Sequence, residues 1–169
     1  MHTDKIYFPR ATGRDPARLS CSLLRELAER QSADIRLPNG RNFRLVAYPI
    51  GNGINPWQIM SIEVEAENGE MVGHVDIKDL SRINKGFDDA DAMAIEVDFK
   101  YRRQLCGVGE ALMNSALALA WLAGNDQFTV SDSEADGFYK NMGFQPSGKS
   151  LVRMLDPSRI GSVNISVKK

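Results

Sequence analysis

Residues 108–123 are rich in alanine and leucine and predict a strong helix. Its polar positions Glu110 and Asn114 fall on one face, and Gly124 marks the expected end of the helix. The fully apolar part, 116–123, is too short to cross a bilayer. The sequence therefore predicts a helix within the core of a soluble fold rather than a membrane span.

A basic, glycine-bearing turn at residues 100–109 stands directly before this helix. Gly107 and Gly109 let the backbone approach a ligand closely, and a helix N-terminus offers unpaired N–H groups to an anion. Positive charge around the turn comes from Lys100, Arg102 and Arg103. The pattern favours a phosphate site, although glycines also occur in tight turns for packing reasons. Neither a P-loop nor a Rossmann fingerprint fits, because no Gly-Lys-Ser/Thr and no third glycine follows.

Composition indicates one ordinary globular domain. The chain has 169 residues, 43% of them hydrophobic and 25% charged, with a net charge of −1. Near-neutral charge argues against a general electrostatic grip on nucleic acid. The N-terminus has no apolar stretch typical of a signal peptide, so a cytoplasmic protein is expected. The two cysteines, Cys21 and Cys106, are too few for a disulfide scaffold, and the two histidines lie too far apart to indicate a metal site.

Charge is unevenly distributed along the chain. Residues 63–98 carry a balance of −8, whereas 1–45 and 149–169 each carry +4. Solvated surface faces explain such zones most simply.

Hydrophobic periodicity and turn signals give the expected elements. Asp15 and Pro16 predict a helix start, Asn68-Gly69 a hairpin turn, and Ser133 with Asp136 a capping-box-like helix start. Strands are expected at about 5–8, 43–50, 58–66, 71–77, 94–99, 128–131, within 144–155 and at 162–167; helices at 15–31, 108–123 and 133–142; and a loop at 83–90.

Two motifs in this order resemble the GCN5-related N-acetyltransferase (GNAT) superfamily. The first is Gln104-Leu105-Cys106-Gly107-Val108-Gly109, which satisfies the acetyl-CoA signature Gln/Arg-x-x-Gly-x-Gly/Ala. The second is Phe138-Tyr139-Lys140-Asn141-Met142-Gly143-Phe144, which looks like the family's Phe-Tyr-x-x-x-Gly-Phe helix and its exit. The resemblance covers about 92–155, and residues 1–91 match only in outline. Leu105-Cys106 departs from the Arg-Gly-x-Gly-x-Gly form of many members.

The resemblance implies a single acyl-CoA N-acyltransferase-like domain over residues 1–169. Its fold would be α/β of the α+β type, with a splayed, mixed, mostly antiparallel sheet flanked by helices. Acetyl-CoA would be the co-substrate, with no metal. Its pantetheine would meet the backbone of Val97 and Phe99. Its pyrophosphate would lie in the turn, whose cofactor-binding residues would be Arg102, Arg103, Gln104, Leu105, Cys106, Gly107, Val108 and Gly109.

Acyl transfer to an amine needs a base, donors for the oxyanion and an acid for the leaving thiolate. The resemblance makes Tyr139 the first candidate for the acid, since a phenol can donate a proton to a thiolate; the alternative is a packed aromatic. Glu96 is the leading base, with Asp98 second, against an exposed polar strand face. His74 is a further base candidate or an ordinary strand histidine. A reactive Cys106 has no visible partner base, and loop packing explains it more simply.

The sequence supports several functions. The main hypothesis is direct acetyl transfer to an amine: a small molecule, a polyamine or a protein amino group. An acidic zone would suit a cationic acceptor; it comprises Asp88, Asp89, Asp91, Glu96 and Asp98. The alternative is a catalytically degenerate module that binds acyl-CoA or a protein. A third reading, RNA-directed acetylation, would use Arg10, Arg14, Arg18 and the basic tail. Dimers are common in the resembled family, and the tail at 162–167 is a segment that subunits of a homodimer could exchange.

Overall fold

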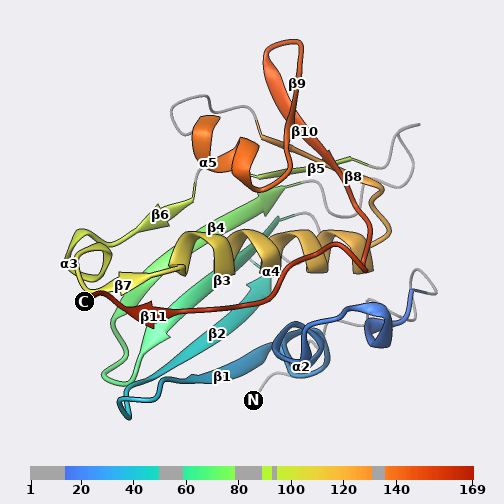
Figure 1. Cartoon of the computed structure of the whole chain (residues 1–169). Coiled ribbons are helices and arrows are strands. Elements are labelled where there is room, and N and C mark those ends of the chain that lie inside the picture. Colours follow the sequence, from blue (N-terminus) through green and yellow to red (C-terminus); the bar gives the residue numbers. More distant parts are fainter. Residues whose placement is uncertain (1–13, 50–58, 79–88, 93–94, 131–135) are drawn as a thin grey trace.

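A computed structural model describes residues 14–49, 59–78, 89–92, 95–130 and 136–169, and one large sheet organises them (Figure 1). The strands are β1 (Ser32–Arg36), β2 (Asn42–Pro49), β3 (Ile59–Ala66), β4 (Met71–Lys78), β5 (Asp89–Ala92), β6 (Glu96–Val97), β7 (Leu105–Cys106), β8 (Gln127–Val130), β9 (Gln145–Ser147), β10 (Ser150–Met154) and β11 (Ser166–Val167). The helices are the short 3₁₀ helix η1 (Pro16–Arg18), α2 (Ser22–Arg30), α3 (Phe99–Arg102), α4 (Val108–Leu122) and α5 (Asp136–Asn141).

The sheet is mixed and opens in its middle. Its order is β1-β2-β3-β4-β5-β8-β10-β9, and every pair is antiparallel except β5 with β8. β4 pairs with β5 at Ile77 and with β6 at Gly73 and His74. In the described residues β6 has no partner besides β4, so the sheet parts between β6 and β8. This is the splayed, mostly antiparallel sheet flanked by helices that the sequence predicts.

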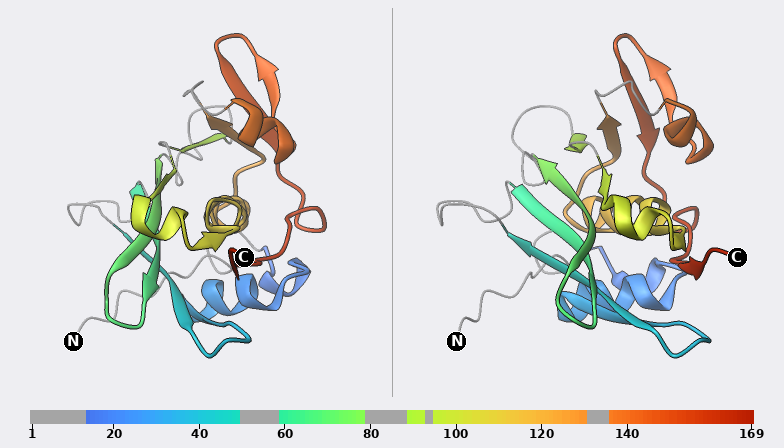
Figure 2. Two further views of the ribbon diagram at one scale, coloured as in Figure 1. Left: turned by 60° about the vertical axis from the view of Figure 1, so that its left-hand side comes forward. Right: turned by 90° about the vertical axis from the view of Figure 1, so that its left-hand side faces the viewer.

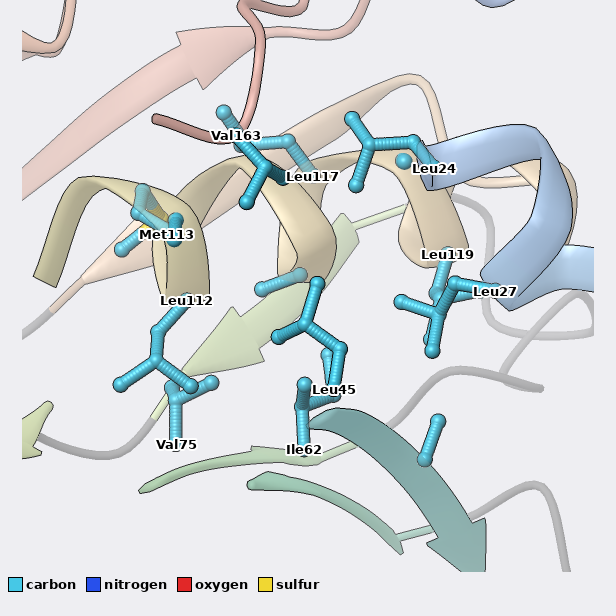
Figure 3. Packing of buried hydrophobic residues seen from close by; sticks show 14 of the residues in the cluster. Leu24, Leu27, Leu45, Ile62, Val75, Leu112, Met113, Leu117, Leu119 and Val163 are labelled. Carbon is cyan, nitrogen blue, oxygen red and sulfur yellow. The ribbon is translucent and has the colours of Figure 1, made fainter. Parts of the chain in front are cut away.

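Helix α4 is the centre of the core. All of its residues from Ala111 onward are at most 6% exposed, as expected for a helix whose later turns are almost wholly apolar. Its side chains pack on β3 and β4 and against α2, where Leu117 and Leu119 lie near Leu24 and Leu27 (Figure 3). The prediction of this helix is confirmed, but Asn114 on its polar face is buried rather than exposed.

Residues 160–165 cover the side of α4 that the sheet leaves open (Figure 2). Ile160, Val163 and Ile165 are each at most 7% exposed and belong to the core cluster. Figure 3 shows Val163 beside Leu117. The chain then ends as β11, which pairs with β7 of the same chain. Among the described helices, none is long and apolar enough to cross a membrane.

The far end of α4 is fixed by a residue from the start of the described chain. Arg14 Nη1 donates to the carbonyl oxygens of Trp121 and Asn125 at 2.7 and 2.6 Å, and Arg14 Nη2 contacts Asp126 Oδ1 at 2.7 Å. The Arg14 and Arg18 guanidinium groups each lie 5.3 Å from the centre of the Trp121 ring. A cation satisfies C-terminal carbonyl groups and complements the helix dipole there. Both arginines therefore have a structural use, which removes support from the RNA reading; Arg10 lies outside the described residues.

Most predicted elements are confirmed in the described chain. These are the strands near 43–50, 58–66, 71–77 and 128–131, two strands within 144–155, the hairpin turn at Asn68-Gly69, and the second helix, described as α5. The expected strand at 5–8, Ser133 and most of the expected loop at 83–90 lie outside the described residues; the end of that loop, from Asp89, is β5.

Three predictions are wrong in part. The expected helix at 15–31 is broken into η1 and α2 at Leu19–Cys21, although Asp15 does cap η1 by accepting from Ala17 N. The strand expected at 94–99 is only two residues long, because Phe99 already begins α3. The strand at 162–167 shortens to β11. The sequence analysis also missed three elements, β1, α3 and β7.

Gly73 of β4 lies where β4 meets both β6 and the first turns of α4. A Cβ at this position would lie 2.8 Å from the Glu96 carbonyl oxygen and 3.2–3.3 Å from Leu112 and Val108 side chains. The missing side chain thus lets β6 and the start of α4 approach β4 together.

We expect Gly73→Ala to lower the free energy of unfolding by about 1–3 kcal/mol, because the added methyl group overpacks a closed contact. Urea unfolding followed by circular dichroism measures this. Gly137→Ala is the matched control: its Cβ would meet nothing within 4 Å, and alanine in a helix is worth up to about 1 kcal/mol. Equal stability of the two variants would contradict the packing role of Gly73.

Candidate functional site

The turn between β6 and α4 carries the motif that predicted a phosphate site. Asp98 caps α3, its side chain accepting from Lys100 N at 2.9 Å, and β7 then leads into Gly107. Gly107 is the N-cap of α4 with φ +87, a left-handed conformation that favours glycine. The local sequence thus turns the chain sharply so that α4 begins at the turn.

The first turn of α4 presents backbone N–H groups. Ala111 N bonds back to Gly107 O at 2.9 Å, which leaves the N–H groups of Val108, Gly109 and Glu110 ahead of the helical ladder. These groups and the helix dipole make a place for an anion. Glu110, an exposed carboxylate in the same turn, stabilises the helix end when no anion is bound.

The side chains of the motif divide between core and surface. Leu105 and Val108 are 4% and 3% exposed, so their side chains belong to the core and only their backbones face the turn. Gln104 is half-buried, and Cys106 is exposed on β7. Loop packing therefore does not bury the Cys106 thiol, and the residue's structural part is its backbone pairing with Ser166.

The two predicted arginines lie beside the turn in different ways. Arg102 Nη2 donates to the Val97 carbonyl oxygen at 3.2 Å. The Arg103 guanidinium stacks over the Phe99 ring at 4.5 Å. Both side chains are exposed and positioned by α3. The structure thus brings positive charge to the approach of the turn.

Val97 has its backbone on the unpaired edge of β6. Asp98 N donates to Val72 O at 2.8 Å, and Gly73 faces Val97 in the register. Backbone groups alternate in direction along an antiparallel strand, so the N–H and C=O of Val97 point away from β4. They face the opening of the sheet. Phe99 does not continue this edge: it lies in α3 with its side chain 63% exposed, which corrects its expected strand role.

A row of polar side chains crosses the sheet face opposite α4. The register aligns Glu63 of β3, His74 of β4 and Glu96 of β6, and Tyr48 of β2 donates a hydrogen bond to Glu63. The Glu96 carboxylate lies 3.9 Å from His74 Nε2, and its side chain is 72% exposed. Burial and the hydrogen bond to Glu63 raise the pKa of Tyr48 above its ordinary value. Two base candidates, Glu96 and His74, are therefore neighbours beside β6.

Asp98 is engaged elsewhere. Its carboxylate serves the cap of α3, as described above, rather than standing free beside Glu96. Glu96 therefore remains the leading carboxylate of this strand.

Tyr139 is enclosed in an aromatic cluster on α5. Its side chain is 2% exposed, and its ring meets those of Phe138 and Phe144 edge-on at 5.3 and 5.6 Å. Phe138 in turn lies 3.4 Å from a Cβ placed on Gly109, so α5 packs on the second glycine of the turn. The structure thus places Phe138 against the turn and Tyr139 beside Phe138, in the packed surroundings that the alternative described.

A hydrogen bond from Tyr101 and an ion pair from Lys100 fix α3 to Glu70 of the β3–β4 hairpin. Tyr101 O–H donates to Glu70 Oε2 at 2.6 Å, and Lys100 Nζ contacts the same oxygen at 3.1 Å. The Tyr101 hydrogen bond, followed by Lys100, lowers the pKa of Glu70, and Glu70 raises the pKa of Tyr101. Because α3 leads into the turn, this contact supports the site from behind.

An open cavity of about 770 Å³ lies away from this site, between α5, the β9–β10 hairpin and residues 159–161. Asn114, Arg153 and Gly161 are among its lining residues, and none of the predicted site residues is. The Arg153 guanidinium donates hydrogen bonds to the carbonyl oxygens of Met142 and Arg159. Among the described residues, no group of three or more His, Cys, Asp and Glu side chains could hold a metal ion.

Comparison with known proteins gives a consistent result. A family model described as "Acetyltransferase (GNAT) domain" matches residues 59–146. No curated protein sequence matches the chain.

Solved structures resemble the fold at low sequence identity. The spermidine/spermine N-acetyltransferase SpeG from Vibrio cholerae is 15% identical with a TM-score of 0.50, over 61% of this chain and 69% of that one. An acetyltransferase of the GNAT family from Staphylococcus aureus is 16% identical with a TM-score of 0.48, over 59% and 70%. A GNAT family N-acetyltransferase from Escherichia coli, solved in complex with CoA, is 17% identical with a TM-score of 0.46, over 62% and 63%.

We expect Tyr101→Phe to lower the Tm by about 2–4 °C at neutral pH, because a hydrogen bond to a charged acceptor is lost. The lowered pKa of Glu70 means that this stabilisation is present above the ordinary carboxyl pKa of 4.5 and is lost as the pH falls through the lower folded value. Thermal melts of both proteins between neutral and acid pH measure the difference. Glu67→Gln, at the same hairpin, is the control; a Tm difference that persists unchanged in acid would contradict this assignment.

Proposed function

Because the chain belongs to the GNAT acetyltransferase family, we propose that it transfers an acetyl group from acetyl-CoA to an amine acceptor by direct attack. One observation carries the proposal. The turn from Gln104 to Gly109 opens into the N-terminus of α4 immediately beside the unpaired edge of β6. An anion site and a free strand edge lie together, as a long ligand with a phosphate group requires. Residues 1–169 would form one such domain.

The binding roles follow from the backbone. In this proposal the pyrophosphate accepts hydrogen bonds from the first N–H groups of α4, with Arg102 and Arg103 supplying charge. The amide-containing pantetheine arm pairs with Val97 along β6. The Val97 carbonyl accepts one hydrogen bond from Arg102, and its second lone pair could accept another from the pantetheine amide. The buried side chains of Leu105 and Val108 keep the turn rigid and contribute only backbone groups.

The transfer itself moves one acetyl group and two protons. The acceptor ammonium loses a proton to the Glu96 carboxylate, directly or through water, and the neutral nitrogen attacks the thioester carbonyl. The C–N bond forms and the C–S bond breaks. Tyr139 then gives its phenolic proton to the departing thiolate, and the acylated nitrogen loses its second proton, through solvent, to the Tyr139 phenolate as it becomes the neutral amide. His74 Nε2 lies 3.9 Å from the Glu96 carboxylate, and a protonated His74 would balance the negative charge of that carboxylate.

We propose a cationic amine as the acceptor class. Glu63 and Glu96 flank His74 on one open sheet face, which favours positive charge. The structural neighbour SpeG is itself a spermidine/spermine N-acetyltransferase. Of the acidic residues named from the sequence, Asp88 lies outside the described chain, and Asp89 and Asp91 are placed only as part of β5.

A second candidate is a module that binds acyl-CoA without turnover. The enclosure of Tyr139, 2% exposed among aromatic rings, favours it, because such packing is a sufficient reason for an aromatic residue at this position.

Calorimetric titration with acetyl-CoA and an acetylation assay with polyamines and lysine peptides test both candidates. We expect Glu96→Gln and Tyr139→Phe to keep their affinity for acetyl-CoA while kcat/KM falls about 10²–10⁴-fold, the usual worth of general acid–base catalysis. Glu65→Gln, which removes a different carboxylate from the same sheet face, is the control.

The outcomes separate the candidates. Binding without turnover by the wild-type chain, on every amine tried, favours the binding module. A folded wild-type chain that does not bind acetyl-CoA overturns both.

A further inference from the structure

Residues 166–168 lie directly on the turn proposed to bind acetyl-CoA. β11 pairs antiparallel with β7, with Ser166 facing Cys106 and Val167 facing Leu105 (Figure 1). Beyond the strand, Lys168 N donates to Gln104 O at 2.8 Å. In the described chain β7 has no other strand partner. The backbone of the turn is therefore held by residues some sixty positions further along the sequence.

Gly107 is in contact with the same segment. A Cβ on Gly107 would overlap the carbonyl oxygen of Asn164 and lie 3.7 Å from the Cα of Ile165. The N-cap of α4 thus has its backbone closed on one side by residues 164 and 165. Glycine is needed here both for φ +87 and for this approach.

The segment is itself anchored to α4. Asn114, 6% exposed, donates from Nδ2 to the Ser162 carbonyl oxygen at 3.0 Å. Gly161 leaves room for that side chain, since a Cβ there would lie 3.0 Å from Asn114 Nδ2. Val163 and Ile165 are buried between these polar contacts. The anchor and the turn are thus connected through one rigid helix.

We propose that residues 162–168 are a positioning segment that holds the Gln104–Gly109 turn in its binding conformation and so sets the affinity for acetyl-CoA. This inference rests on the proposed function. Without β11, the two-residue strand β7 would lose its pairing, and the turn would have to be ordered at the moment of binding. That ordering would be subtracted from the binding free energy. The segment lies outside residues 59–146, so this support is additional to the matched family domain.

Lys168→Pro tests the proposal with a small change. Proline removes the N–H that bonds to Gln104 and restricts the residue before it to extended backbone, which Val167 already has in β11. Lys168→Ala keeps the N–H and serves as the conservative variant. Lys169→Pro places the same ring one residue beyond the segment and is the control.

Three measurements are compared across these proteins. Hydrogen exchange reports the protection of the amides of residues 104–107 without ligand, calorimetry gives the Kd for acetyl-CoA, and steady-state kinetics separates KM from kcat. For Lys168→Pro we expect faster exchange in the turn, and a Kd and KM for acetyl-CoA raised about fivefold or more, with kcat at saturating acetyl-CoA kept. For Lys168→Ala and Lys169→Pro we expect the exchange rates, Kd and KM of the wild-type protein.

The proposal and the function on which it rests fail differently. A Lys168→Pro protein with faster exchange or a lower Tm but an unchanged Kd shows that the segment only stabilises the fold, and overturns the positioning role. A reduced kcat at unchanged KM overturns it equally. A wild-type chain that does not bind acetyl-CoA overturns the proposed function, and this inference with it.

Discussion

The burial of α4 from Ala111 onward is the constraint on which the structure depends. Because even its polar residues Asn114 and Ser115 are buried, the helix must be covered on every side beyond its first turn, and β3, β4, α2 and the segment 160–165 are among the parts of the chain that cover it. Each of these surfaces fixes the helix axis. The N-terminus of α4, where Gly107 begins the first turn, is consequently held at the opening of the sheet by the whole core. The packing of the core therefore determines where the candidate site lies.

The opening in the sheet follows from how β4 divides its pairing. Its end at Ile77 keeps β5, which remains joined to β8, while its middle at Gly73 takes β6. Within the described residues, the other edge of β6, at Val97, has no strand beside it. Gly73 permits this because it has no side chain between the Glu96 carbonyl and α4. The absence of a Cβ at Gly73 therefore allows both the close packing of α4 on β4 and the pairing of β6 with β4.

The sequence predicted what depends on short stretches of chain. The α4 helix, the hairpin turn at Asn68-Gly69 and the glycine turn are all encoded within a few residues, and they are as expected. The strand at 94–99 failed because the Asp98 side chain, which caps α3, competed successfully with strand alternation. The proximity of His74 to Glu96 and the pairing of β11 with β7 were missed, because no local pattern specifies a register between distant segments. The signal for α3 that the sequence did contain was Asp98, a residue type that favours the N-cap position of a helix.

The proposed site residues and the residues that hold them in place come from different parts of the chain. Residues 59–146 supply the turn, the strand edge, Glu96 and Tyr139. The parts outside supply constraint: Arg14 fixes the far end of α4, and residues 160–168 close on its near end. Tyr48 also comes from outside, and its hydrogen bond to Glu63 extends the polar row that starts at Glu96. In the proposed function this polar row would meet the amine, and Tyr48 would be the contribution of the N-terminal half of the chain to that side of the site.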